Sequence, residues 1–278
     1  MHMYHKSLMT FKSRLKAYLA CLPYLFCRFL CPFVHWKNRG KTRVLVFHHL
    51  DKPALFEKTL YALARHYHLI SFNQYLRNEK SPDKINVILA FDDGYRSWFE
   101  HGLRLLRTYH ICPLLFINSD FIGLDTAAAH HYCHNAITTW PEASLSWQEL
   151  KALAEAGAEI GGHALGHRDL TATEPESAVM DAIASDRAAI QLSLGNNIRS
   201  FAYPFGRYNS TSIRCVEKAG YSYGFSSDSG FLDDSTSPFI LKRTNVGMRP
   251  PLVALAMAEG WNDWLSDIVC TFKKMIAR

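Results

Sequence analysis

Seven short apolar runs alternate with helical stretches along most of this chain, and this alternation limits the fold more than any other feature of the sequence. The runs are rich in Val, Ile, Leu, Phe or Tyr, as β-strands are, and they span residues 44–48, 87–91, 114–118, 159–162, 200–203, 222–226 and 240–246. Helices are expected between them at residues 53–67, 95–109, 147–156, 174–194 and 209–219. Strands that alternate with helices pair in parallel, so the sequence predicts an α/β fold with a distorted (β/α)7, TIM-like barrel.

Polar residues stand where several of these strands end. His48 ends the first strand, Asp92 and Asp93 follow the second, His163 follows the fourth, and the segment 201–206 ends the fifth. In a parallel barrel the carboxyl ends of the strands open on one face, where active sites are built. These residues are therefore expected to converge, although they lie far apart in the sequence.

The paired aspartates and two histidines have the composition of a metal-dependent hydrolytic site. One carboxylate with the imidazoles of His163 and His167 can bind a divalent cation, and the second carboxylate is then free to act as a base. Each pattern alone has a simpler reading, because Asp-Asp-Gly often caps a helix and histidines four residues apart often face solvent. Their combination at strand ends favours metal-assisted hydrolysis.

The basic charge of the chain is concentrated at its start. Residues 1–43 contain nine Lys or Arg and no Asp or Glu, which leaves 22 basic and 25 acidic residues in the rest of the chain. A nucleic-acid enzyme is expected to carry basic charge over its body, so no nucleic-acid partner is predicted. The basic arm instead favours an anionic membrane surface as partner.

The two ends of the chain carry amphipathic patterns, and they divide it into a basic arm (1–42), a barrel (43–250) and a C-terminal amphipathic helix (251–278). In the arm, Lys16 and Arg28 bracket only eleven uncharged residues, whereas a membrane-spanning helix needs about 20. An interfacial helix is therefore preferred over a spanning or cleaved segment, and packing of the arm on the barrel stays open. Trp261 and Trp264 begin an apolar stripe that either packs on the barrel or faces a membrane.

Two further features bear on location and substrate. The chain has seven cysteines and no CxxC motif, which favours a reducing compartment over a disulfide framework. The stretch 125–144 contains His130, His131, Cys133 and His134, which are too tightly bunched to close a metal tetrahedron unaided. We expect this insertion to lie over the active-site mouth and to contact substrate through Tyr132 or Trp140.

The motifs resemble those of a known family. Phe91-Asp-Asp-Gly94, His163-Ala-Leu-Gly-His167 and Phe201-Ala-Tyr-Pro-Phe-Gly206 are similar, in order, to the first three motifs of the polysaccharide deacetylases, the family 4 carbohydrate esterases with a NodB homology domain. The segment from Arg43 to Leu50 resembles the opening of the branch that includes the poly-N-acetylglucosamine deacetylases. The resemblance runs from about Arg43 to Met248 and implies a NodB-type barrel.

The resemblance also implies roles for individual residues. It makes Asp93, His163 and His167 the ligands of one divalent metal ion, zinc first, with Co²⁺, Ni²⁺ or Mn²⁺ as alternatives. Asp92 would be the general base. His48 would be the general acid that protonates the departing amine. The backbone N–H of Phe205 would donate a hydrogen bond to the oxyanion.

Two departures from the family pattern matter for this assignment. Ala164 stands where many members have Ser or Thr, and Ala202 stands where many have an arginine that orients the base carboxylate. Arg243 or Arg199 could replace that arginine, and Arg243 is favoured because it lies on the strand that should close the barrel. Neighbouring residues alternate in direction along a strand, so only one of His48 and His49 is expected to face the barrel centre.

The function expected from these observations is removal of the N-acetyl group from an N-acetylated amino sugar in a bacterial glycan or lipid-linked glycan precursor. The periphery of the bacterial inner membrane is the expected location, on its cytoplasmic face before the periplasmic one. An exported deacetylase of polymeric glycan is the alternative within the enzyme class. Because Ala164 and Ala202 depart from the pattern, a catalytically inactive carbohydrate-binding barrel is the alternative outside it.

Overall fold

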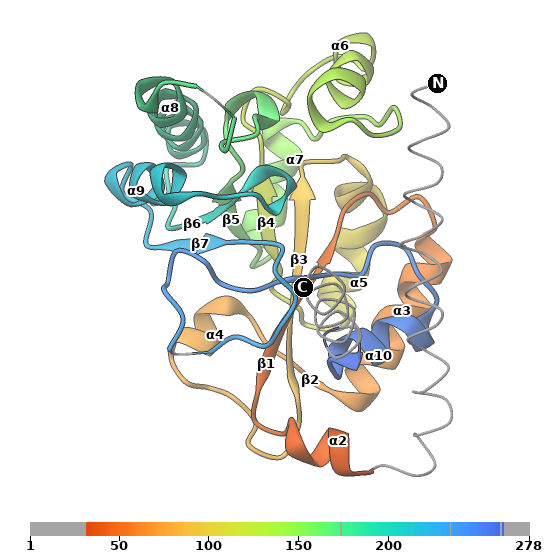
Figure 1. The fold of residues 1–278 in the computed structure, drawn as a ribbon. Coiled ribbons are helices and arrows are strands. Elements are labelled where there is room, and N and C mark those ends of the chain that lie inside the picture. The colour runs from red at the N-terminus through yellow and green to blue at the C-terminus, as the bar shows by residue number, and fades with distance from the viewer. Residues whose placement is uncertain (1–31, 173, 234, 262, 264–278) are drawn as a thin grey trace, which may run out of the picture.

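The computed structural model describes residues 32–172, 174–233, 235–261 and 263, and it contains one mainly parallel sheet covered by helices (Figure 1). Its strands are β1 (Thr42–Phe47), β2 (His68–Leu69), β3 (Asn86–Asp93), β4 (Leu114–Ile117), β5 (Glu159–Gly162), β6 (Ser200–Ala202), β7 (Tyr223–Phe225) and β8 (Thr244–Asn245). Their order in the sheet is β7-β6-β5-β4-β3-β1-β8. Every strand pair in this path is parallel, as the alternation of strands and helices predicted.

The sheet closes through the segment that contains β8. Thr244 and Asn245 pair with β1, and Leu241 forms a parallel bridge with Phe225 at the end of β7. The predicted strand 240–246 is therefore divided between two partners, because it crosses from β7 to β1. The two-residue strand β2, which was not predicted, pairs with the beginning of β3. The expectation of a distorted seven-stranded barrel is confirmed.

Helices fill the connections between strands. Those that match predicted helices are α3 (Pro53–His66), η1 with α5 (Trp98–Gly102 and Leu103–Thr108), α7 (Trp147–Glu155), α8 (Glu176–Leu194) and α9 (Ser210–Lys218). The others are α2 (Pro32–Lys37), α4 (Phe72–Leu76), α6 (Thr126–Tyr132), η2 (Cys133–Ile137), α10 (Pro251–Ala258) and the single turns η3 (Leu165–His167) and η4 (Pro204–Gly206). Ser146 and Glu149 form a reciprocal capping box that starts α7.

Two apolar layers hold the barrel together. The inner layer is formed by strand residues that point into the barrel, such as Val44, Val46, Ile88, Ala90 and Phe116. The outer layer lies between the sheet and the helices and includes the alternate strand residues, which are Leu45, Phe47, Val87, Leu89 and Phe91. Alternation along β1 and β3 thus supplies both layers. Burial on both faces explains why these strands read as continuous apolar runs.

Helix α10, near the end of the described chain, belongs to the outer apolar layer. Residues 253–258 of α10 are buried, and α10 lies against α3. No helix among the described residues is both long enough and apolar enough to cross a bilayer. Residues 1–31 of the predicted interfacial arm (1–42) and the apolar stripe from Trp264 onward lie outside the described residues, so the proposed division into three segments stays a prediction.

Candidate active site

A cavity of about 450 Å³ opens at the carboxyl ends of the strands. Its lining includes six of the seven site residues predicted from the sequence: His48, Asp92, Asp93, His163, His167 and Phe205. Arg243 is the exception, because it is buried and reaches Asp92 from within the barrel. Parallel pairing therefore brings together residues from β1, β3, β5 and β6 or from the loops that follow them.

Asp93, His163 and His167 form the one group of metal-binding side chains found in the described part of the chain. Asp93 Oδ1 lies 3.6 Å from His163 Nε2 and 3.5 Å from His167 Nε2. Tetrahedral zinc with bonds of about 2.0–2.2 Å places its ligand atoms roughly 3.3–3.6 Å apart. The three donor atoms therefore fit a single divalent ion of this size.

Backbone carbonyl groups orient both imidazoles for metal binding. His163 Nδ1 lies 2.7 Å from the Ala202 carbonyl oxygen, and His167 Nδ1 lies 3.3 Å from that of Ala136. A proton on each Nδ1 leaves a lone pair on each Nε2, which faces Asp93. Ala202 contacts His163 through its backbone carbonyl oxygen. The contact is therefore independent of the side chain at position 202, where many family members have an arginine.

Burial also sets the charge of the three ligands in the metal-free protein. It lowers the pKa of His163 to about 3 and that of His167 to about 4, so both rings are neutral near pH 7. Burial raises the pKa of Asp93 to about 6, with Asp92 adding to the effect and His48 and Tyr95 opposing it. Neutral imidazoles and an ionised carboxylate are the forms that bind a metal.

Unusual backbone conformations concentrate at this site. Of the seven described non-glycine residues with positive φ, five line the cavity or lie between the histidine ligands: Asp93, Thr138, Ala164, His167 and Phe205. Strand alternation would send Asp92 and Asp93 to opposite faces of the sheet, yet both line the cavity. The φ of 90° at Asp93 marks the point where the extended conformation of β3 ends. Such strain persists only where surrounding contacts hold it.

Three polar side chains hold the loop that carries the histidines. Asn118 Nδ2 donates to the carbonyl oxygens of His163 and Ala164, at 2.7 Å each. Asp120 accepts from the Gly166 N–H, and Asp186 of α8 accepts from the N–H groups of Ser119 and His163. The loop is thus braced without the hydroxyl that Ala164 lacks.

Close packing around Asp186 leaves no room for a side chain at Gly162. A Cβ atom at Gly162 would lie 2.1 Å from Tyr221 Oη and 2.9 Å from Asp186 Oδ2. Only glycine therefore lets α8 approach the end of β5 this closely.

The sequence analysis did not identify Asn118, Asp120 and Asp186 as residues of the site. Asn118 ends a predicted strand and Asp120 follows it, which is the signal that identified His48 and the aspartates, whereas nothing in the sequence marks Asp186 in the middle of a helix.

Asp92 is held by Arg243 and lies next to the metal-binding group. Arg243 Nη1 donates to Asp92 Oδ1 at 2.7 Å, and its Nε donates to the Ser226 carbonyl oxygen at 2.9 Å. Burial alone would raise the pKa of Asp92, but Arg243, His163 and His48 outweigh burial and lower it. Asp92 is therefore ionised near neutral pH. Arg199 is exposed and instead donates to Asn73, so Arg243 occupies the place expected for the substitute arginine.

His48 and His49 both line the cavity, and the expectation that only one of them faces the barrel centre stays a prediction. Strand β1 ends at Phe47, and the strict alternation of directions ends with it. Trp98 Nε1 donates to the His48 carbonyl oxygen at 2.7 Å and fixes this loop. His49 Nε2 lies 3.7 Å from Asp51 Oδ1, a contact that His48 lacks among the described ion pairs.

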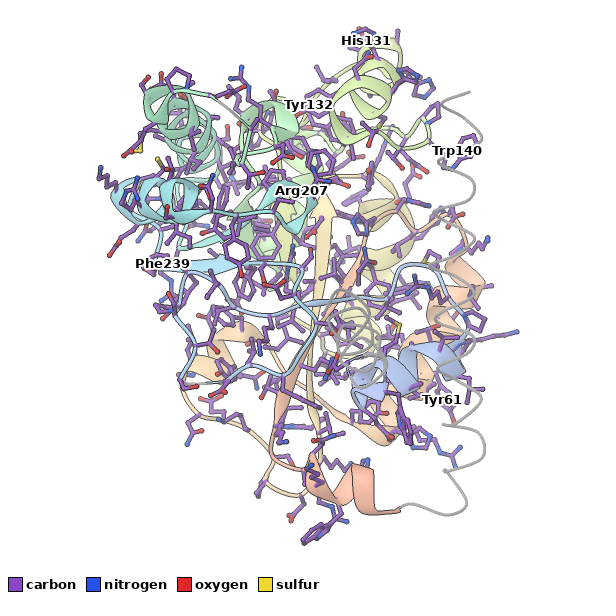
Figure 2. All side chains as sticks on the ribbon, in the orientation of Figure 1. Tyr61, His131, Tyr132, Trp140, Arg207 and Phe239 are labelled. Carbon is purple, nitrogen blue, oxygen red and sulfur yellow. The ribbon has the colours of Figure 1, made fainter. Side chains whose placement is uncertain are left out.

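Phe205 and the insertion form part of the cavity wall. The Phe205 ring packs edge-on against His167, with centroids 4.5 Å apart, and its side chain is 43% exposed. The insertion folds as α6 and η2, and Ile137, Thr138 and Thr139 line the cavity. Figure 2 shows Tyr132 and Trp140 at the same end of the molecule as Arg207, which follows η4. The Tyr132 hydroxyl donates to Asp120 at 2.8 Å, so Tyr132 braces the histidine loop.

A comparison with protein families agrees with this geometry. The model of the family described as polysaccharide deacetylase matches residues 79–224, which contain all three motifs. This chain belongs to the polysaccharide deacetylase family. The match begins after His48 and ends before Arg243, so the assignments of these two residues rest on the geometry above and on the resemblance of the first strand.

Two curated proteins are similar to part of the chain. A Bacillus subtilis protein named as a polysaccharide deacetylase, YxkH, is 24% identical over 171 residues, which are 62% of this chain and 55% of the relative. The poly-beta-1,6-N-acetyl-D-glucosamine N-deacetylase of Staphylococcus epidermidis is 26% identical over 165 residues, which are 56% of this chain and 53% of the relative. The chain thus spans about half the length of the curated relatives it matches.

Solved structures support the fold. The Streptococcus pyogenes deacetylase PplD has a TM-score of 0.64 and 20% identity, with 78% of this chain and 98% of that chain covered. IcaB from Ammonifex degensii has a TM-score of 0.64 and 21% identity, with 79% and 97% covered. These likenesses show that the polysaccharide deacetylase fold extends over the barrel described above.

Proposed function

We propose that this protein is a metal-dependent N-deacetylase that removes acetyl groups from an N-acetylated amino sugar in a glycan. The observation that carries the proposal is the arrangement of Asp93, His163 and His167 around one point, with the Arg243-bound Asp92 beside them in the same cavity. Family membership supports the reaction class. The name of the Staphylococcus epidermidis relative supports N-acetylglucosamine as the sugar of that glycan.

Each residue has a defined part in the proposed hydrolysis. Asp93, His163 and His167 would bind a divalent ion, for which zinc fits the donor set, and this ion would lower the pKa of water and polarise the acetyl carbonyl group. Asp92, ionised and oriented by Arg243, accepts a proton from the attacking water. The water oxygen bonds to the acetyl carbon and gives a tetrahedral oxyanion. When this oxyanion collapses, the carbon–nitrogen bond breaks, and acetate and a free amine leave.

His48 and Phe205 complete the reaction. His48 lines the cavity with Asp92 and donates a proton to the departing amine. The backbone N–H of Phe205 stabilises the oxyanion, a role that requires no particular side chain. A catalytically inactive barrel is the alternative, because Ala164 and Ala202 lack the side chains usual at these positions. The braces at Asn118 and Asp186 and the position of Arg243 favour the enzyme over that alternative.

The test is acetate release from a panel of N-acetylhexosamine monomers and oligomers, with and without a chelator. Wild type should release acetate in a metal-dependent manner. Asp92→Asn should lose activity by about 10²–10⁴-fold while it still binds metal, because Asp92 is not in the metal-binding group. Asp93→Asn should lose metal binding as well. A metal-loaded wild type that releases no acetate from any member of the panel would reject the proposal.

The location and the carrier of the sugar are part of the same proposal. We propose that the substrate is a lipid-linked glycan precursor at the inner membrane, and the basic composition of residues 1–43 supports this. Deletion of residues 1–40 should then release the protein from membranes and reduce its activity on lipid-linked sugar more than on a soluble oligomer. An unchanged preference after deletion would favour the exported enzyme acting on polymeric glycan, which the name of the Staphylococcus epidermidis relative supports.

A further inference from the structure

A second cavity, also of about 450 Å³, lies at the opposite end of the barrel from the catalytic cavity. It is bounded by Gly40 to Thr42 at the start of β1 and by residues 231–233, and it shares no lining residue with the catalytic cavity. Helix α2 precedes β1 at this end, which Figure 1 shows at the bottom, away from the carboxyl end of β3. No residue in the lining of this cavity has a part in the proposed deacetylation.

Three lysines from separate segments line this cavity: Lys41, Lys80 and Lys242. None of them forms an ion pair within the described part of the chain, where Lys218 is the one lysine that does. Asp233 is the one acidic residue in the lining, and it accepts hydrogen bonds from the Ser235 backbone and hydroxyl group. The formal charge of the lining is therefore +2.

Contacts with neighbouring side chains hold two of the three lysines in place. Lys41 Nζ lies 5.4 Å from the centre of the Phe231 ring, and Lys80 Nζ lies 5.2 Å from the centre of the Tyr75 ring. Lys41 Nζ also donates to Asn38 Oδ1 at 2.9 Å. These contacts hold two ammonium groups against the wall of the cavity. Gathering three like charges is unfavourable, and an anion between them would relieve the repulsion.

A buried hydroxyl group provides independent support. Thr42 lines the cavity and is 2% exposed, and its Oγ1 has no hydrogen-bond partner among the described residues. A buried hydroxyl without a partner is costly, so such groups usually have one. A ligand oxygen in the cavity would supply it.

We propose that this second cavity binds a phosphate group, carried either by an anionic lipid headgroup or by a soluble phosphorylated molecule. A phosphate dianion matches the formal charge of +2, and its oxygens can accept from ammonium groups and from a hydroxyl group. Lysine binds phosphate as a point charge, so no fixed fork of donors is required. The site does not depend on the proposed deacetylation, since the two cavities are separate.

The test is calorimetric titration of the full-length protein with inorganic phosphate. The double variant Lys80→Ala/Lys242→Ala should bind phosphate at least about tenfold more weakly than wild type, because two charged donors are lost. The control is Lys58→Ala/Lys151→Ala, which removes the same charge from exposed positions on α3 and α7 and should bind as wild type does. Phosphate bound at the metal site would be common to all three proteins. Equal affinities in all three, or no phosphate binding by wild type, would overturn the proposal.

Vesicle sedimentation separates the two sources of phosphate. If the lipid headgroup is the ligand, wild type should sediment with phosphatidylcholine vesicles that contain phosphatidylglycerol, and Lys80→Ala/Lys242→Ala should lose this binding more than the control variant. If a soluble molecule is the ligand, both variants should sediment equally while their phosphate affinities differ. Activity on a small N-acetylated sugar should be unchanged in the pocket variant, which also reports that the barrel is folded.

Discussion

Arg243 and Asp92 are separated by 151 residues in the sequence, yet Nη1 of Arg243 donates to Oδ1 of Asp92 across 2.7 Å inside the barrel. The arginine is 1% exposed, and it is fixed by a second hydrogen bond to Ser226 and by the Phe116 ring 5.1 Å away. Closure of the barrel by the segment around β8 thus brings a cation to the base carboxylate. The guanidinium group that orients Asp92 thus comes from a distant part of the sequence, outside the three motifs.

Arg243→Ala should lower kcat/KM for deacetylation by about 10²-fold or more, because the base carboxylate loses its orientation. The unfolding free energy should also fall by roughly 3–5 kcal/mol, since a buried carboxylate is left unpaired. Steady-state assays under saturating metal and thermal unfolding would measure the two effects. Arg199→Ala is the matched control and should stay within about twofold of wild type, because the Arg199 side chain is exposed. Full activity of Arg243→Ala would contradict the assignment.

Asn118 provides a test of the brace beneath the histidine loop. Asn118→Ala removes both hydrogen bonds to the carbonyl oxygens of His163 and Ala164, so the metal affinity should fall about 10–100-fold. Titration of the apoprotein with zinc in the presence of a competing chelator would measure this. Asn135→Ala, which removes a contact to His131 on the exposed insertion, should leave the affinity unchanged. Equal affinities for Asn118→Ala and wild type would show that the loop holds its shape without this amide.

The sequence was sufficient to predict the barrel and most of the candidate site. The reason is geometric, because parallel strands place their carboxyl ends together and Asp92, Asp93 and His163 stand at those ends. The short helix α4 was missed, although Ser71 and Gln74 form a capping box whose pattern is readable in the sequence.

Other features depend on contacts that no local pattern encodes. Asp186 lies in the middle of α8, and its role follows from the approach of that helix to the ends of β4 and β5. The presence of both His48 and His49 in the cavity lining follows from the end of β1 at Phe47, and strand ends are poorly defined by sequence. To predict these features, one would have to know how distant elements pack together.

Trp140 is the substrate contact that we expect from the insertion. Its side chain is 79% exposed, and it directly follows Thr138 and Thr139 in the cavity lining, whereas Tyr132 is engaged with Asp120. Trp140→Ala should raise KM for an N-acetylglucosamine oligomer about tenfold, as expected for the loss of one aromatic contact, and leave kcat and the KM for a monomer nearly unchanged. Tyr61→Ala, at another exposed aromatic residue, should match wild type. Equal effects on monomer and oligomer would exclude a contact with a second sugar unit.

Glu159 makes the stability of the fold depend on pH away from the metal site. Burial raises the pKa of Glu159 above its ordinary value of 4.5, and the hydrogen bond from the Asn73 N–H only partly offsets this. The folded state therefore holds this proton more tightly, so the contribution to stability is full below pH 4.5 and is lost as the pH rises through the folded-state pKa. Each unit of difference in pKa corresponds to about 1.4 kcal/mol.

Glu159→Gln keeps an acceptor for the Asn73 N–H and removes the charge, so it should abolish this dependence. Melting temperatures measured from pH 4 to pH 8 should fall more steeply with rising pH in wild type than in Glu159→Gln, because only wild type can ionise residue 159 in that range, whereas the other carboxyl groups are common to both proteins. Glu155→Gln, at an exposed position of α7, should follow the wild-type curve. Parallel curves for wild type and Glu159→Gln would mean that Glu159 ionises without cost in the folded protein, and they would contradict the prediction.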